Sequence, residues 1–505
     1  MLKPVCMATI AEALTLALDH HLAGRLAEAQ QLYNRILDVD PDQPDALHFL
    51  GVLAGQVGEQ ALGLQLIARA IAQRPEAADM HANSGNIRRS SGQPEAAVED
   101  YRRAVALQPD FAEAWTDMAN ALRGLGRSPG AIAALERAVT STPTLAIAVE
   151  RLGALRHEEG RLLVEQGRGT EALRPLARAA ELLPLEADVA FLYGNALFAM
   201  GLREDSTLAY RNALAITPDF PSAAFNLGIA LGVVDQLEDS ARALEQAARL
   251  DPRHLDAIDR LVIALALLGR DDEAAVWGER ALDLKDRTAM DTAPALPPLT
   301  ARPRGAEQRR RNVIAFSLWG GQPTSAQPVG THDPAEIVRQ TVALYAGWSC
   351  RVYHDGTLAA DRLSELAAAG ADLVAVAADA PTGGPYWRLT AADDPTVARF
   401  LCRDWDALPS ADGKAAVDDW IASGRPFHVL RDGVLHTEVM SGGHWGGVAG
   451  LLPDLLPLAE RHGAAEADRA QDHRFLRRIV WPMIRDHALV HDRAHPRHGL
   501  PFPTP

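Results

Sequence analysis

The chain has 505 residues, of which 48% are hydrophobic and 23% are charged, so it is long enough for more than one domain. Its formal net charge of −16 argues against binding to nucleic acid or to an anionic membrane, because both need clustered Lys and Arg. The three cysteines are too widely spaced for a disulfide framework or a C-x-x-C metal site, and no apolar stretch is long enough to span a bilayer, so we expect a cytoplasmic protein.

A period of 34 residues runs through the first half of the chain. Proline ends a helix and glycine permits a tight turn, so each period predicts two helices. The spacing and the residue pattern resemble the tetratricopeptide repeat (TPR), and we expect an all-α superhelix of about eight helix pairs over residues 8–287. The positions that carry the period are Pro41, Pro75, Pro109, Pro143, Pro184, Pro218 and Pro252, with glycines at Gly24, Gly58, Gly92, Gly126, Gly167, Gly201 and Gly269.

One interruption breaks the period. Seven extra residues lie between Gly153 and Gly167. They either lengthen a helix by about two turns or enlarge the turn that follows it.

Asparagines recur on the expected first helix of several pairs. A side-chain amide donates and accepts hydrogen bonds, so a ladder of asparagines could hold the backbone of an extended protein acceptor in the groove of the array. The alternative is that these residues only solvate an exposed helix face. The layout resembles the TPR arrays that are fused to protein O-glycosyltransferases. The residues are Asn83, Asn86, Asn120, Asn195 and Asn226.

The period stops near Leu284, and residues 288–311 are rich in proline. We interpret them as an extended linker, because Pro294, Pro297 and Pro298 are incompatible with a continuing helix. The arginines at 309–311 are interpreted as a solvated boundary.

Residues 312–505 follow a different pattern. Short apolar runs alternate with amphipathic segments in the order strand, helix, strand, helix, strand, which predicts an α/β, Rossmann-like domain with parallel strands. Such sheets bind ligands at the carboxyl ends of their strands. The residues expected beside a nucleotide are therefore Ser317, Trp319, Gly320 and Asp355.

Two aspartates, Asp404 and Asp406, follow a later apolar segment. Carboxylates one residue apart at the end of a buried strand can chelate a divalent cation that neutralises a departing diphosphate. The spacing alone is weak evidence, since Asp38 and Asp40 share it in a turn of the array. The alternative is a helix cap or a solvated turn.

The whole segment from Asn312 to Pro503 resembles a bacterial glycosyltransferase-like domain of the GT-A type, in motifs such as "FSLWG", "YWRLTAADDPTVARFLCRDWD", "GGHWGG" and "DHRFLRRIVWP". The resemblance implies a nucleotide-sugar donor and a Mn²⁺ or Mg²⁺ ion held by Asp404 and Asp406. It also implies that His491 completes the metal site and that Asp472 contacts the sugar or acts as a base.

Three further side chains are expected near the donor. Arg388 suits a diphosphate, although it could instead form a surface salt bridge with Asp393 or Asp394. Arg403 is either a phosphate partner or a neighbour that keeps the aspartates ionised. Trp445, flanked by glycines, is expected on a loop where it could stack on a ligand.

The leading hypothesis is a metal-dependent glycosyltransferase whose acceptor is recruited by the array. The main alternative is a protein-interaction scaffold with a degenerate second domain, since Lys414, Ala415, Gly433 and Val434 depart from the motifs of the family. A third hypothesis, a metal hydrolase, would place His487, His491 and His495 on one helix face.

Overall fold

The computed structural model describes residues 9–300, 311–318, 332–376, 383–405, 408–462 and 469–503. The chain divides into two compact units, Met1–Pro218 and Asp219–Pro505. No helix in the described ranges is both long and apolar enough to cross a membrane.

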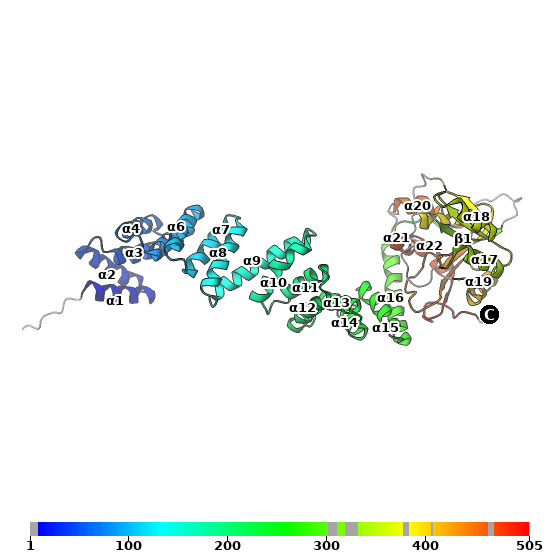
Figure 1. The fold of residues 1–505 in the computed structure, drawn as a ribbon, viewed down its shortest axis with the longest axis horizontal. Coiled ribbons are helices and arrows are strands. Elements are labelled where there is room, and N and C mark those ends of the chain that lie inside the picture. The colour runs from blue at the N-terminus through cyan, green and yellow to red at the C-terminus, as the bar shows by residue number, and fades with distance from the viewer. Residues whose placement is uncertain are drawn as a thin grey trace, which may run out of the picture. The chain divides into compact units, whose positions relative to one another are not determined.

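The first unit consists of helices that pack as consecutive antiparallel pairs (Figure 1). Stacking buries the apolar face of each pair against its neighbours, as expected for a repeat array. The pairs are α1 (Ile10–Leu22) with α2 (Leu26–Val39), α3 (Pro44–Gln56) with α4 (Gln60–Gln73), α5 (Ala78–Ser90) with α6 (Pro94–Leu107), α7 (Ala112–Gly124) with α8 (Ser128–Ser141), α9 (Ala146–Glu165) with α10 (Gly169–Leu182), and α11 (Ala187–Ala199) with α12 (Arg203–Ile216).

The periodic glycines occupy the turns within the pairs. Every one has a positive φ, between 71° and 91°, which a residue with a Cβ adopts at a cost. In the seventh pair Asp235 takes the same position with a φ of 60°. The glycine series therefore marks a backbone requirement, and the predicted turns are confirmed.

The interruption of the period is a longer helix. The first helices of the other pairs have 13 residues, whereas α9 has 20. The seven extra residues thus extend α9 by about two turns, and the alternative of an enlarged turn is wrong.

The second unit begins with two more pairs and continues into an α/β domain. The last helix of the array runs to Thr292, so the expected linker starts later than residue 288, just before its first proline, Pro294. Leu296 and Leu299 then pack against the core of the α/β domain, so this stretch is not a free spacer. The helices are α13 (Pro221–Val233), α14 (Leu237–Leu250), α15 (Leu255–Leu267) and α16 (Asp271–Thr292).

The α/β domain contains a sheet of seven described strands in the order β3-β2-β1-β4-β6-β5-β7. The predicted parallel pairing of the first three strands is confirmed, and β6 alone runs antiparallel to both of its neighbours. The strands are β1 (Arg311–Leu318), β2 (Trp348–His354), β3 (Ala371–Ala375), β4 (Val397–Cys402), β5 (Phe427–Arg431), β6 (Trp445–Val448) and β7 (Ala488–Asp492).

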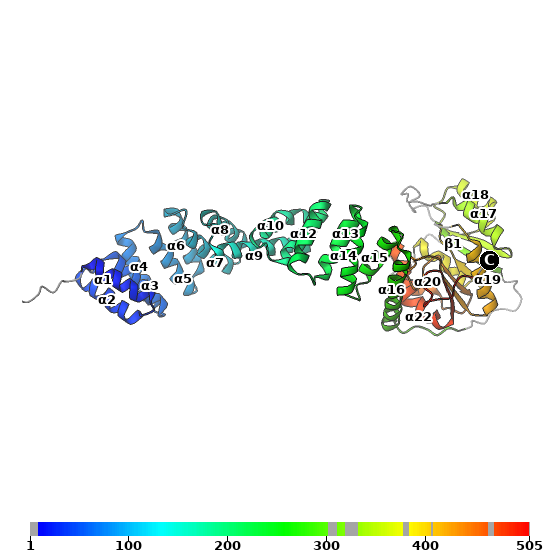
Figure 2. The ribbon, with the colours of Figure 1, turned by 90° about the horizontal axis from the view of Figure 1, so that it is seen from below.

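Helices cover both faces of this sheet (Figure 2). Alternate residues of β1 enter two cores, because side chains of a strand point to opposite faces: Ile314 and Phe316 pack towards one face, Val313 and Ala315 towards the other. On the first face lie α17 (Pro334–Leu344), α18 (Ala360–Ala368) and α19 (Ala411–Ser423). The second face carries the 3₁₀-helix η1 (Gly384–Ala392), α20 (Leu455–Arg461), α21 (Arg469–Phe475), the π-turn η2 (Leu476–Val480), α22 (Trp481–Ile484) and η3 (Arg485–His487).

Helix α16 lies alongside η2 and α22. Lys285 of α16 is 2% exposed, and its Nζ lies 2.8 Å from Asp259 of α15 and 3.0 Å from Glu438 in the β5–β6 connection. Asp286 accepts hydrogen bonds from Trp481 and Arg485. The last pair of the array is thus an integral part of the second unit.

Candidate active site

Three charged side chains from distant parts of the sequence meet beyond the carboxyl end of β4. Arg388, in η1, donates from Nη1 to the carboxylate of Asp404, and its Nη2 lies 3.1 Å from Asp472 Oδ2 in α21. The side chains of Arg388 and Asp472 are 5% and 10% exposed. The structure thus joins three residues that the sequence suggested separately. The alternative of a surface salt bridge for Arg388 is wrong, and Asp394 pairs with Arg351.

Ser317, at the end of β1, holds this cluster in place. Its hydroxyl accepts a hydrogen bond of 2.9 Å from the backbone N–H of Arg388, and its carbonyl accepts one of 2.7 Å from the indole of Trp405. Trp405 also packs on Phe316 with ring centroids 4.4 Å apart. Ser317 therefore positions Arg388 from a rigid strand.

Two glycines allow the chain before β6 to approach the cluster closely. A Cβ on Gly442 would lie 2.3 Å from Asp472 Oδ2, and a Cβ on Gly443 would lie 2.2 Å from Asp404 Oδ2. Neither position has room for a side chain. In the sequence Gly443 was interpreted only as a flank of Trp445, and the structure shows that it and Gly442 make room for this close contact.

The pKa values of Asp404 and Asp472 are shifted in opposite directions. Burial raises the pKa of Asp404, but the Arg388 guanidinium outweighs it, and the net pKa lies below its ordinary value. Burial also raises the pKa of Asp472, and there it prevails. Opposite pKa shifts of two neighbouring carboxyls are a feature of sites that carry out acid–base chemistry.

Several buried polar atoms at this cluster lack a hydrogen-bond partner among the described residues. They are Asp472 Oδ1, Arg388 Nε, Arg403 Nη2 and the hydroxyl of Tyr386. Buried polar atoms are nearly always paired in folded proteins, so such a concentration indicates a place where a ligand, ion or water binds.

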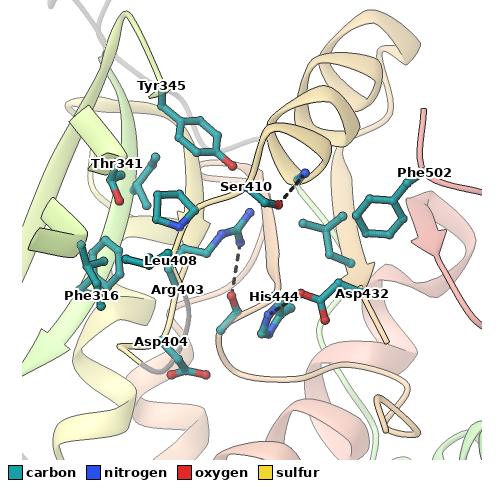
Figure 3. A pocket seen from close by; sticks show the side chains of 16 residues that line it. Phe316, Thr341, Tyr345, Arg403, Asp404, Leu408, Ser410, Asp432, His444 and Phe502 are labelled. Carbon is teal, nitrogen blue, oxygen red and sulfur yellow. Dashed lines mark hydrogen bonds and ion pairs between the residues drawn. The ribbon is translucent and has the colours of Figure 1, made fainter. Parts of the chain in front are cut away.

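A cavity of about 60 Å³ opens beside the cluster (Figure 3). Asp404, Arg403, Asp432 and His444 contribute its polar lining, with Phe316, Tyr345 and Phe502 among its apolar walls. This volume accommodates an ion with a few waters. Residues 319–331, 377–382 and 406–407, which follow β1, β3 and β4 in the chain, lie outside the described residues.

Arg403 lines the cavity without pairing with Asp404. Its Nη1 donates to the carbonyl of Cys402 at 2.8 Å, and Arg388 is the residue that neutralises the aspartate. Arg388, and not Arg403, is therefore the neighbour that favours the ionised form of Asp404.

The expectation of a loop position for Trp445 is wrong. Trp445 is the first residue of β6, is fully buried, and packs edge-on against Phe400 with centroids 5.0 Å apart. The flanking glycines suggested a loop, but Gly446 and Gly447 pair with β4 and β5 as strand residues.

His491 is not brought to Asp404. It lies in β7, with one ring nitrogen 3.0 Å from His428 and the other 3.1 Å from Asp419 of α19. The shared helix face expected for His487, His491 and His495 is also absent, because His487 is in η3, His491 is in a strand, and His495 follows it in a loop bound to Asp492.

The remaining predicted donor contacts are placed as follows. Asp355 lies beyond β2 and accepts from the backbone and hydroxyl of Thr357, and it is not among the residues that line the cavity. Asp406, Trp319 and Gly320 lie outside the described residues.

Sequence reasoning missed a second cluster at the edge of the cavity. Asp432, His436 and His444 lie in the connection between β5 and β6, and one donor atom from each lies within 4.8 Å of the others. A hydrogen bond with His436 lowers the pKa of Asp432 to about 2, and burial lowers the pKa of His444 to about 4. The signal was available, since three potential ligands occur within thirteen residues.

The five asparagines expected in the groove all lie on first helices of their pairs and are half-buried. Most of them make internal hydrogen bonds. Asn86 accepts from Tyr101 at 2.7 Å and Asn195 from Tyr210 at 2.9 Å, each within its own pair. Asn83 bonds to His48 of the preceding pair. These internal contacts within and between helix pairs are a structural function that was not considered from the sequence.

Comparison with known families detects repeats in this array. A TPR repeat profile matches residues 85–126, and a tetratricopeptide repeat profile matches residues 157–221 and 225–287. No curated protein matches the chain.

Several solved structures are similar to parts of the chain at low identity. The MamA protein is 20% identical over 34% of this chain and 93% of its own, with a TM-score of 0.29. YrrB, a TPR protein with an unusual peptide-binding site, is 22% identical over 38% and 95%, with a TM-score of 0.27. A tetratricopeptide repeat protein from Parabacteroides merdae is 14% identical over 51% and 98%, with a TM-score of 0.29. The profile matches, together with the helix pairs, identify the N-terminal part of this chain as an array of tetratricopeptide repeats.

Proposed function

We propose that the α/β domain is a metal-dependent glycosyltransferase that uses a nucleotide-sugar, and that the TPR array recruits its protein or glycan acceptor. The observation that carries this proposal is the cluster of Asp404, Arg388 and Asp472 beside a cavity at the carboxyl edge of a mostly parallel sheet. A sheet of this kind is compatible with the GT-A-type domain that the sequence resembles.

The residues present fit a divalent cation. Asp472 Oδ1 is buried without a hydrogen-bond partner among the described residues, His473 Nε2 lies 3.8 Å from it, and Arg388 pairs with both Asp404 and Asp472. Asp404, with Asp406 two positions further along the chain, would hold the ion. When bound, it supplies positive charge that stabilises a departing diphosphate.

Asp472 is the proposed base. Burial raises its pKa above the ordinary value of an aspartate, and its Oδ1, which has no hydrogen-bond partner among the described residues, can accept the proton of an acceptor hydroxyl. The hydroxyl oxygen then bonds to the anomeric carbon, and the electron pair of the breaking carbon–oxygen bond leaves with the diphosphate. Arg388 fixes both carboxylates in this geometry, and Ser317 fixes Arg388.

Replacement of one carboxylate tests the proposal. We expect Asp404→Asn to reduce the Mn²⁺-dependent hydrolysis or transfer of UDP- and GDP-sugars by at least about a hundredfold, since it removes a charged ligand at the reacting diphosphate. Chromatographic assay of released nucleotide measures the effect. Asp418→Asn, an exposed carboxylate on α19, is the control and should retain activity. Full activity in Asp404→Asn would contradict the assignment.

A protein-interaction scaffold is the second candidate, and the TPR repeats themselves favour it. In that case the α/β domain would bind no nucleotide. Calorimetric titration with UDP and GDP separates the two functions. The enzyme binds one of them only with Mn²⁺ or Mg²⁺ present, and the scaffold binds neither.

A further inference from the structure

The connection between β5 and β6 places three metal-ligand side chains around one point. Asp432 directly follows β5, His444 directly precedes β6, and His436 lies between them. Their donor atoms lie within 4.8 Å of one another, and no other group of three His, Cys, Asp or Glu side chains in the described part of the chain meets this condition.

We propose that Asp432, His436 and His444 bind a divalent transition-metal ion, with Zn²⁺ as the best match to the donor set. Two imidazoles and one carboxylate are a ligand set of zinc sites that keep a fourth position open. Imidazole also favours first-row transition metals over Mg²⁺, which prefers oxygen ligands.

The ring of His444 is already oriented for this function. Ser441 Oγ lies 3.1 Å from His444 Nδ1, which leaves Nε2 directed towards Asp432 Oδ2 at 3.8 Å. His436 Nδ1 lies 2.7 Å from Asp432 Oδ1. A hydrogen bond to the second ring nitrogen is the usual way in which proteins orient a metal-binding histidine.

The backbone of the connection is held firmly. The N–H of Leu430 donates to the carbonyl of His444 at 2.8 Å, which fixes His444 opposite the end of β5. Arg431 donates to the carbonyls of Glu438 and Val439, and Arg477 binds the carboxylate of Glu438 at 3.1 Å. Ligands on a rigid scaffold lose little entropy when the ion binds.

The open coordination position would face the cavity. The carboxylate of Asp432 and the ring of His444 lie next to each other in its wall, which Asp404 also lines (Figure 3). A water or a ligand oxygen bound to the ion would therefore share the cavity with Asp404. The two sites have different donors, so we expect them to select different metals.

Calorimetric titration of the metal-free full-length chain with Zn²⁺ tests the inference. We expect His436→Ala and His444→Ala to weaken binding at this site by at least about tenfold, as is usual when a metal site loses a supporting contact, and to remove one equivalent of tight binding. Asp432→Asn, which preserves side-chain shape, should do the same and guards against a folding defect in the alanine variants. His487→Ala, at an exposed histidine of η3, is the control and should bind as the parent does.

Unchanged Zn²⁺ stoichiometry and affinity in all three ligand variants would overturn the inference and leave Asp432 and His436 as an ordinary ion pair. The inference does not rest on sugar transfer. Asp404→Asn should keep this equivalent of bound Zn²⁺, and excess Mg²⁺ should not compete, so failure of this site and failure of the proposed enzyme are distinguishable. The visible absorption of bound Co²⁺ should be present in the parent and lost in His444→Ala.

Discussion

At the scale of single residues, the α/β domain contains buried charge that is balanced locally. Arg388 serves two carboxylates, and Arg431, 3% exposed, pairs with the fully buried Asp492. A buried charge that loses its partner is costly, whereas an intact pair contributes little net stability. These pairs therefore specify geometry more than they stabilise the fold.

From a pair of buried histidines we expect the domain to lose stability in mild acid. His428 is fully buried, stacks on Trp420, and contacts His491. Burial lowers the pKa of both histidines, and for His491 the carboxylate of Asp419 opposes part of this effect. Below about pH 6.5 these histidines bind protons in the unfolded chain but stay neutral in the folded chain. The free energy of unfolding is therefore expected to decrease as the pH drops through this range.

We predict that the urea midpoint of the α/β domain, followed by tryptophan fluorescence, falls between about pH 7.5 and pH 5.5. In His428→Gln this fall should be smaller, because one buried group no longer has to stay neutral. Asp472, whose pKa is raised, changes stability in the opposite direction, so the difference between parent and variant is the informative quantity. An equal fall in both proteins would show that His428 does not titrate in this way.

At the scale of elements, the β5–β6 connection joins the array to the site. Lys285 of α16 binds Asp259 of α15, and it also binds Glu438 and the carbonyl of Thr437 in the connection. The same connection carries Asp432, His444 and the glycines that contact Asp404 and Asp472. The last helix pair of the array therefore helps to position the cavity wall.

Lys285→Met should lower the stability of the second unit by about 1–3 kcal/mol, because it leaves two partly buried carboxylates next to each other without their cation. Urea unfolding measures this loss, and hydrogen exchange should increase at the amides of residues 432–444. Lys414→Met is the matched control. Its pair with Asp418 spans one turn on the surface of α19 and is worth about 0.5 kcal/mol or less. Similar effects for both variants would contradict a special function for Lys285.

At the scale of the whole molecule, the proposed function places acceptor binding and sugar transfer in different parts of the chain. Under the proposed function the TPR repeats bind the acceptor, and the α/β domain, which contains the charged cavity, binds the donor. Under the proposed function, changes in the array should affect the acceptor and leave the donor unaffected.

Asn120→Ala, on the first helix of its pair, is predicted to raise the KM for a protein acceptor by about 2–10-fold, the value of one hydrogen bond. Hydrolysis of the nucleotide-sugar without acceptor should not change. Asn34→Ala, exposed on a second helix, should affect neither. Circular dichroism melting checks that loss of the contact between Asn120 and Asp117 does not unfold the array. An unchanged KM in a folded Asn120→Ala would exclude this residue from the groove.

The amino-acid sequence by itself determined the repeat array, its turns, and the alternation of strands and helices in the second half. These features depend on local chemistry, such as a proline that stops a helix or a glycine that accepts a positive φ, and they act over a few residues. The sequence left open whether the insert extends α9, and it placed Trp445 on a loop although the chain buries it in β6.

Only the tertiary structure decided which charged residues meet. Arg388 and Asp472 are 84 residues apart in the sequence and 3.1 Å apart in space, and the separation of His491 from Asp404 follows from its place in β7 beside α19. Contacts of this kind depend on strand order and on the packing of helices against the sheet. No local pattern encodes them, because they arise from long-range packing that forms only when the whole domain folds.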